Sequence, residues 1–393
     1  MKGRREVLAV GLVWLVWFGA VLLTVAIGLA AGAYAFAPGW TIHNGLWPLF
    51  GWDYNWYYLI SYTGYPDGQG GPQYAFFPLW PQLLRWSGSI PDVVAAGAVA
   101  WTASAAAFFG VAEGTPRARL RTALALACWP GSFVLTLAYP DALALAAVAW
   151  AAVLAFRGRL LAAGLVGAIA ALARPNGVLI ALPLFWLARG KGPRAWIGAA
   201  VPVAAAAAVE AYFWSHSGNA RVFFDAQRLW GRGGPGRFGD WTSHLVDVLQ
   251  RHGQWIALLT VLAAAAIVIA WRRFGLWPTA VIAYACAVPL LLAATQSLAG
   301  FVNSSRAALV LPLLVILWRL GPLYRPWAAF ATAVVGLLLL SGTMESFGRQ
   351  SLFAFPIFWA IAEGPRWLRY PPLAALGFAA NLGLVLLLTR FAP

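Results

Sequence analysis

Asp53 is the residue in this 393-residue chain whose surroundings most favour acid–base chemistry. It lies in an aromatic stretch over residues 51–81, between Trp52 and Tyr54. A carboxyl group that packs against aromatic surface has a raised pKa and can serve as a general base. The alternative is structural, because Asp is a preferred helix N-cap and a helix beginning at Tyr54 would use it in that way. The residues alone leave both interpretations open.

A second set of polar residues lies at the ends of apolar runs. Ionisable residues in or beside a membrane segment are costly, so each is a functional hypothesis by default. Arg174 and Arg306 are candidates for binding a phosphate through two parallel hydrogen bonds, and the alternative for each is snorkelling to the membrane interface. Asp141 is either a site residue or a helix cap. Gln227 and Trp230 either bind substrate or anchor a loop.

The histidines do not suggest a metal centre. His43, His216, His244 and His252 lack the spacing of metal ligands, and no carboxylate pair has it either. We therefore predict neither a metal site nor a cofactor, and leave open whether a metal assists the chemistry.

The composition indicates which elements must position these residues. The chain is 62% hydrophobic and 10% charged, whereas soluble domains carry about 25% charged residues. Apolar runs of roughly 20 residues, the length that crosses a bilayer, recur from end to end. We predict an all-α, polytopic membrane protein of about 11 to 13 transmembrane helices, forming one domain over residues 1–393.

The net charge of +15 reflects topology rather than nucleic-acid binding. Most of the basic residues fall in alternate loops, as the positive-inside rule expects. This pattern predicts a multi-pass membrane protein with a cytoplasmic N-terminus, and it places Asp53 outside.

The predicted outer segments carry most of the candidate residues. The first outer loop, over residues 37–91, contains Asp53 and is aromatic enough for a helix lying in the membrane interface. The second outer loop spans residues 215–254. Further predicted elements are a span over 122–138, two short apolar pieces at 160–173 and 177–188 on either side of Arg174-Pro175-Asn176, and an outer turn over 342–350.

Five motifs in order resemble those of the PIG-V-like mannosyltransferases. WDYNWYYLISYTGYP followed by YAFFPLWP is similar to that family's W-D, G-Y and F-F-P-x-x-P signature. The later matches are WPGSFVLTLAYPDALAL, ALARPNGVL, SGNARVFFDAQRLWGR and NSSRAALVLPLL, and together they reach to about residue 315. Trp129, Pro140-Asp141 and Asn219-Ala220 depart from the family pattern, which bears on the acceptor more than on the fold.

The resemblance implies a fold and an activity. Such enzymes have the GT-C fold, use a polyprenyl-phosphate sugar as donor, and in several branches need no metal. Their catalytic base is an acidic residue in the first outer loop, which corresponds to Asp53. The Ala-, Arg- and Gly-rich composition is typical of a bacterium with GC-rich DNA, of the actinobacterial kind.

We therefore expect transfer of mannose from polyprenyl-phosphate-mannose to a lipid-linked or cell-envelope glycan at the outer face, with inversion and with Asp53 as base. Further expected partners are membrane lipids, and no nucleic acid. The expected binding residues are Arg174, Asn176, Arg306, Gln227, Trp230, Tyr139, Asp141, Trp52, Tyr65, Tyr74, Phe76 and Phe77. The alternative from another class is a transporter or flippase of lipid-linked sugars, for which we would expect internal repeats and broken helices at the bilayer midplane.

Overall fold

The structure is helical throughout the part of the chain that it describes. This computed structural model describes residues 2–31, 53–87, 116–129, 131–230, 310–340 and 347–364, together with residues 261, 265, 268, 272 and 382. No strand occurs in these ranges, so the all-α prediction is confirmed for them. The assignment of one domain over 1–393 stays a prediction.

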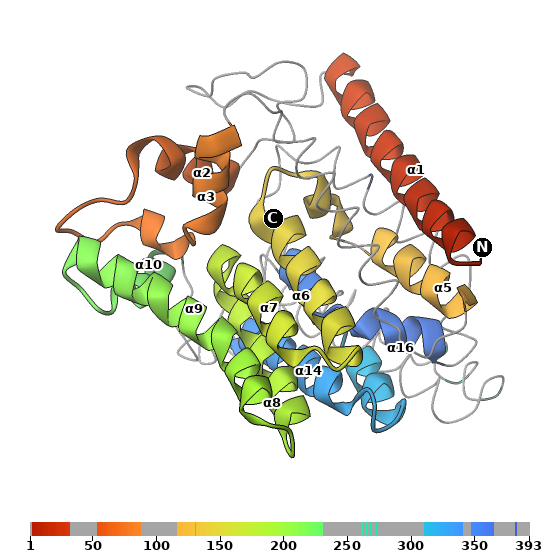
Figure 1. The fold of residues 1–393 in the computed structure, drawn as a ribbon. Coiled ribbons are helices and arrows are strands. Elements are labelled where there is room, and N and C mark those ends of the chain that lie inside the picture. The colour runs from red at the N-terminus through yellow and green to blue at the C-terminus, as the bar shows by residue number, and fades with distance from the viewer. Residues whose placement is uncertain are drawn as a thin grey trace.

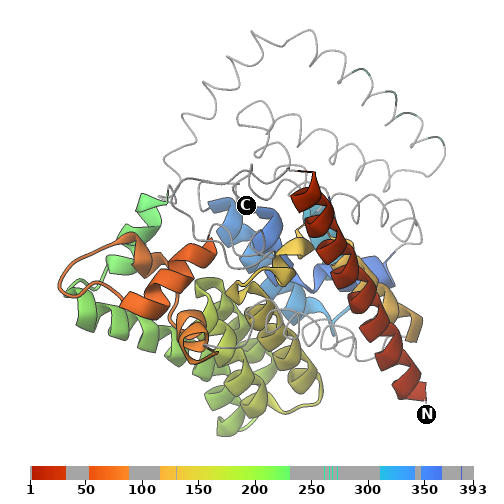
Figure 2. The ribbon, with the colours of Figure 1, turned by 90° about the horizontal axis from the view of Figure 1, so that it is seen from above.

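The N-terminal half of the bundle lies on two sides of its centre (Figure 1). Helix α1 (Lys2–Ala30) lies on one side and packs on α5 (Pro116–Ala127). On the other side are α2 (Asp53–Thr63), the 3-10 turn η2 (Pro72–Ala75) and α3 (Leu79–Ser87). Figure 2 shows the same separation from above, with α2 and α3 beside α9 and α10.

The centre of the bundle is built from closely spaced helices. These are η3 (Ser132–Thr136), α6 (Pro140–Phe156), α7 (Leu160–Ala173), η4 (Pro175–Ile180), α8 (Ala181–Ala188), α9 (Pro193–Ser217) and α10 (Val222–Leu229). Helix α7 packs against both α6 and α9. A Cβ atom on Gly164 of α7 or Gly198 of α9 would overlap the backbone of the facing helix, so these glycines permit the close approach.

The C-terminal elements complete the core behind α6. They are the helix Val310–Arg319, α14 (Arg325–Leu340), α15 (Phe347–Gln350), η6 (Ser351–Ala354) and α16 (Ile357–Glu363). Trp327 and Trp359 are fully buried with ring centroids 6.0 Å apart, and Phe355 packs on Trp359 at 5.3 Å. Aromatic burial on this scale holds α14, η6 and α16 together as one unit.

Two predicted elements differ in the structure. The span predicted over 122–138 is not one helix, because α5 ends at Ala127 and Gly131 has a φ of +139°, which a helix does not allow. In the outer turn predicted over 342–350, the described residues 347–350 form the short helix α15, whose first three residues are buried rather than exposed as in a surface loop. The placement of this segment on the outer side stays a prediction.

The membrane topology stays a prediction. Within the described ranges, Gly11–Gly28 in α1 and Pro193–Ser217 (α9) are long and apolar enough to cross a membrane. The number of spans and their orientation stay predictions.

Candidate active site

Two residues that precede prolines mark the centre of the site. Tyr139 precedes Pro140 and has φ −117° and ψ 156°, and Arg174 precedes Pro175 and has φ −151° and ψ 145°. Proline disfavours the helical region in the residue before it, so the chain is extended at both points. Helix α6 therefore begins after Tyr139, and α7 ends before Arg174. The predicted break between two short apolar pieces at Arg174 is confirmed.

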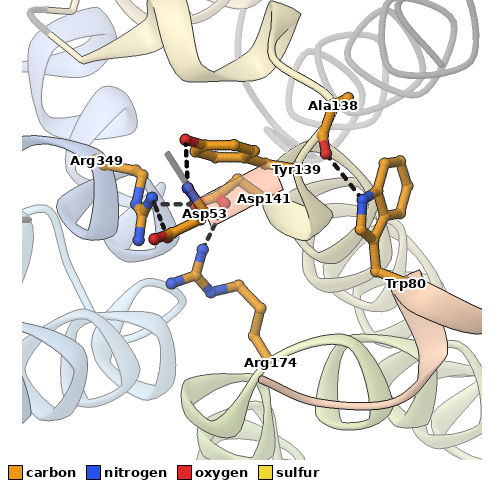
Figure 3. Close-up of polar contacts among 7 residues, drawn as sticks. All are labelled: Asp53, Trp80, Ala138, Tyr139, Asp141, Arg174 and Arg349. Carbon is orange, nitrogen blue, oxygen red and sulfur yellow. Dashed lines mark hydrogen bonds and ion pairs between the residues drawn. The ribbon is translucent and has the colours of Figure 1, made fainter. Parts of the chain in front are cut away.

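Four charged side chains from four elements meet beside these breaks (Figure 3). The Nη1 atom of Arg349 in α15 lies 2.6 Å from Oδ2 of Asp53 in α2. The Nε atom of the same arginine lies 3.9 Å from Oδ1 of Asp141 in α6. Asp141 is in turn ion-paired through Oδ2 with Nη1 of Arg174. We call these four residues the charge cluster, and its formal charges balance.

Asp53 is attached to the cluster through its backbone as well as its carboxylate. It is the first residue of α2, where a negative charge is favoured by the helix dipole. Its backbone N–H donates a hydrogen bond of 3.2 Å to the hydroxyl of Tyr139. Nearby, the indole N–H of Trp80 in α3 donates to the carbonyl of Ala138 at 2.9 Å. The first loop is therefore fixed to the start of α6 at two adjacent residues (Figure 3).

The two carboxylates of the cluster differ in access. The side chain of Asp53 is 21% exposed and that of Asp141 is 2% exposed. Asp53 can therefore reach a bound molecule, while Asp141 is enclosed by protein. The N-cap residue of α6 is Tyr139, and neither carboxylate oxygen of Asp141 makes a hydrogen bond among the described residues, so the capping interpretation for Asp141 is wrong.

The two guanidinium groups are both buried and paired. The Arg174 side chain is 9% exposed, so the snorkelling interpretation, which needs an exposed head group, is wrong. Burial by itself lowers the pKa of Arg349, but Asp53 and Asp141 raise it and the net direction is upward, so the guanidinium stays charged. Its Cζ atom lies 5.3 Å from the ring centroid of Tyr139, a cation–π distance.

The tyrosines beside the cluster stay neutral. Burial raises the pKa of the Tyr139 phenol, and the Asp53 carboxylate raises it further. Burial likewise raises the pKa of Tyr57, although Arg174 opposes the shift. Neither phenol ionises near neutral pH, so the charges of the cluster come from its carboxylates and guanidinium groups.

The aromatic residues predicted to line the site form a separate cluster. Tyr65, Tyr74, Phe76 and Phe77 are buried against α9 and α10, with Phe213 of α9 among their contacts. The Tyr65 hydroxyl donates to the Phe76 carbonyl at 2.6 Å, and the Tyr74 hydroxyl donates to the Pro66 carbonyl at 2.5 Å. We call these residues the aromatic cluster. Tyr57 connects it to the site, since its ring contacts both Phe76 and Tyr139.

Gln227 and Trp230 hold the segment around α10 against η2. The Gln227 side-chain amide donates to the Ala75 carbonyl at 3.3 Å, and the Trp230 indole donates to the Pro72 carbonyl at 3.4 Å. Both acceptors belong to η2. These bonds support the anchoring interpretation, and a substrate-binding role for the two residues stays a prediction.

Asn176 lies two residues beyond Arg174, in η4, and is 5% exposed. Its side-chain amide has no hydrogen-bond partner among the described residues. The structure therefore places it close to the cluster in sequence without assigning it a contact. Trp52 and Arg306 lie outside the described residues.

Arg349 is the functional candidate that the sequence did not indicate. It lies in a short segment predicted as an outer turn, where an arginine attracts no attention. One signal was available, because the segment after it, from Ser351 to Ala362, holds no charged residue. An arginine at the edge of such an apolar run is a functional candidate for the same reason as Arg174.

The cluster consists of acids and cations rather than metal ligands. In the part of the chain that the structure describes, no group of three His, Cys, Asp or Glu residues is arranged to hold a metal ion. The Arg349 guanidinium, 2.6 Å from the Asp53 carboxylate, favours its ionised form and so opposes the effect of aromatic surroundings expected from the sequence. An ionised carboxylate can accept a proton from a bound molecule.

Comparison with known proteins gives no match to a family model and no match among curated proteins.

Proposed function

We propose that this chain is a membrane glycosyltransferase that transfers mannose from polyprenyl-phosphate-mannose to a lipid-linked or cell-envelope glycan at the outer face of the plasma membrane. The observation that carries the proposal is the partly exposed carboxylate of Asp53, held by Arg349 where the first loop meets the helical bundle. The substrate class in this proposal comes from the five sequence motifs that resemble those of the PIG-V-like mannosyltransferases.

The surface of α1 supports a membrane location. One face of this helix is buried through Trp14, Trp17, Val21 and Val25. The opposite face exposes large apolar side chains, at 55–70% for each of Leu8, Leu12, Leu15, Val16, Leu23 and Ile27. A helix that is apolar on its exposed face is suited to lipid. The exposed Ile197 and Val203 of α9 fit the same environment.

The chemistry that we propose needs one base and a stabilised leaving group. Asp53 accepts the proton of an acceptor hydroxyl as that oxygen bonds to the anomeric carbon of mannose. The bond from the anomeric carbon to the phosphate oxygen breaks, and its electron pair stays on the phosphate. Attack opposite the leaving group inverts the anomeric centre through an oxocarbenium-like transition state. The leaving phosphate is already a weak base, so the protein need not protonate it.

We propose that Arg174, together with Arg306, stabilises the charge on the departing phosphate. In the structure the Arg174 guanidinium is paired with Asp141. The phosphate would therefore bind the Arg174 guanidinium either beside the Asp141 carboxylate or in its place. The ion pair with Asp141 already shows that this buried guanidinium can hold an anion. The aromatic cluster would wall off water from the first loop, and Asn176, Gln227 and Trp230 remain candidates for contacts to the sugar or the acceptor.

The proposal is tested with the purified full-length protein in lipid nanodiscs. The probes are polyprenyl-phosphate-mannose and the glucose analogue as donors, with octyl mannoside and a bacterial polar lipid extract as acceptors. We expect a hexosylated product by mass spectrometry from the mannose donor. If no acceptor is modified but the donor crosses the bilayer of protein-containing vesicles, the transporter alternative replaces the enzyme.

A further inference from the structure

Arg349 is held in place by contacts that do not involve Asp53. The guanidinium lies over the Tyr139 ring at 5.3 Å, and its Nε atom lies 3.9 Å from Asp141. The side chain is 4% exposed, so it has little room to adopt another rotamer. Asp53, by contrast, is partly exposed and has Arg349 as its ion-pair partner. The position of the Asp53 side chain therefore depends on Arg349, whereas Arg349 is held by contacts of its own.

The backbone that carries Arg349 is fixed as well. A Cβ atom on Gly131 would lie 2.5 Å from the carbonyl oxygen of Gly348, so the two chain segments touch through glycine. The Ser351 hydroxyl donates to the same Gly348 carbonyl at 2.9 Å, and the Trp129 indole donates to that hydroxyl at 3.3 Å. These buried contacts anchor α15 on the segment before α6. The segment that presents Arg349 is thus tied to the segment that presents Tyr139.

We propose that Arg349 is a positioning residue for Asp53, which keeps the Asp53 carboxylate ionised and directed at one place beside the Tyr139 hydroxyl. Asp141 serves in this arrangement as the second acid that holds Arg349. The statement about Asp53 stands on the geometry alone, and only its consequence for catalysis rests on the proposed function.

Several charged or titratable groups face Asp53 from the elements packed around it. Arg349 comes from α15, Asp141 and Tyr139 from the start of α6, Arg174 from the start of η4, and Tyr57 from α2 itself. Tyr57 and Tyr139 stay neutral because burial raises the pKa of each. Asp141 is balanced by Arg174, so removal of Arg349 takes away the cation that lies 2.6 Å from the Asp53 carboxylate. The Asp53 carboxylate should then take up a proton at higher pH.

The direct test measures this protonation without any substrate. A carbodiimide reacts with protonated carboxyl groups, and peptide mass spectrometry reports labelling of each Asp across a pH series. In the wild type we expect the labelling midpoint of Asp53 to lie at least about one pH unit below that of Asp67. Asp67 is exposed on the same loop and serves as the internal reference. An Asp53 midpoint at or above that of Asp67 would overturn the proposal even if no variant folds.

Two variants and a control extend the test. In R349Q the Asp53 midpoint should rise by about one to three units, while that of Asp67 stays unchanged. R349K keeps a positive charge and should restore most of the shift, although an ammonium group cannot reproduce the guanidinium contacts. The matched control is R228Q, which removes the exposed pair of Arg228 and Asp225 and should not move the Asp53 midpoint. An unmoved midpoint in folded R349Q contradicts the proposal.

The catalytic consequence has a separate readout. The acid limb of the transfer rate, where activity falls as the base takes up a proton, should move upward in R349Q by the same amount as the labelling midpoint. A general packing defect would lower the rate at every pH and leave the limb in place. If the midpoint moves but no donor gives a product even in the wild type, Arg349 still positions Asp53 and the proposed function has failed.

Discussion

The aromatic cluster consists of residues that the sequence nominated, and the charge cluster combines three nominated residues with Arg349, yet the two clusters are built for different tasks. In the aromatic cluster the Tyr65 and Tyr74 hydroxyls are bonded to backbone carbonyls of their own loop. In the charge cluster, polar groups from α2, α6, α15 and the junction between α7 and η4 face one another across the bundle. Polar groups satisfied within one loop stabilise it, whereas those shared between elements create a site.

The largest expected effect is on stability, from Asp141→Asn. This change leaves the buried Arg174 without a carboxylate, and breaking a buried ion pair costs about 3–5 kcal/mol of unfolding free energy. Asp225→Asn is the control, since it breaks the exposed pair with Arg228 and should cost less than about 1 kcal/mol. Thermal unfolding in detergent compares the two variants, and equal losses would show that the cluster is not a coupled buried unit.

Gly131→Ala should act on the charge cluster without changing a charge. The new Cβ atom would press on the Gly348 carbonyl in a residue whose φ is +139°, at a cost of roughly 1–3 kcal/mol. Displacement of α15 should lower transfer as a change at Arg349 does. Gly218→Ala, with φ +71° and open space around it, should lose only stability. Equal transfer by both folded variants would argue against a positioned α15.

A pair of Tyr→Phe changes compares the two clusters directly. Tyr139 and Tyr74 are both fully buried. Tyr139→Phe removes the hydroxyl that accepts from the Asp53 N–H, and Tyr74→Phe removes the hydroxyl that donates to Pro66, each bond being worth about 1 kcal/mol in unfolding free energy. Only Tyr139→Phe should reduce transfer, by about tenfold, because Asp53 loses the acceptor of its N–H. A similar rate loss in Tyr74→Phe would place the aromatic cluster in the reaction itself.

The smallest effect is expected from Gln227→Ala. If Gln227 only anchors α10 to η2, the loss is one hydrogen bond of about 0.5–1.5 kcal/mol and the KM for donor and acceptor stays unchanged. A raised KM with unchanged kcat would instead show that Gln227 binds substrate. The measurement is steady-state kinetics over a range of both substrates.

The sequence predicted elements better than it predicted contacts. The break at Arg174 was readable because Pro175 restricts the residue before it, and α7 ends at Ala173 as expected. The prediction of one span over 122–138 was wrong because hydropathy carries no information about the positive φ of Gly131, which a helix does not allow. Arg349 was missed because its partner Asp53 is distant in the chain, and no local pattern encodes a pairing between elements.

The candidate site was predicted in part for the same reason. Asp53, Asp141 and Arg174 were nominated one by one from their local surroundings, and the structure shows that they meet. Their mutual pairing decides between alternatives that the residues left open, since it excludes snorkelling for Arg174 and capping for Asp141.

The most direct test of the central claim compares Asp53→Asn with Asp67→Asn in the transfer assay. Both changes remove one carboxylate from the first loop, and only Asp53 belongs to the charge cluster. If Asp53 is the general base, its variant should transfer mannose about 100-fold to 10,000-fold more slowly, while Asp67→Asn keeps the wild-type rate. Transfer by folded Asp53→Asn at the rate of Asp67→Asn would contradict the account.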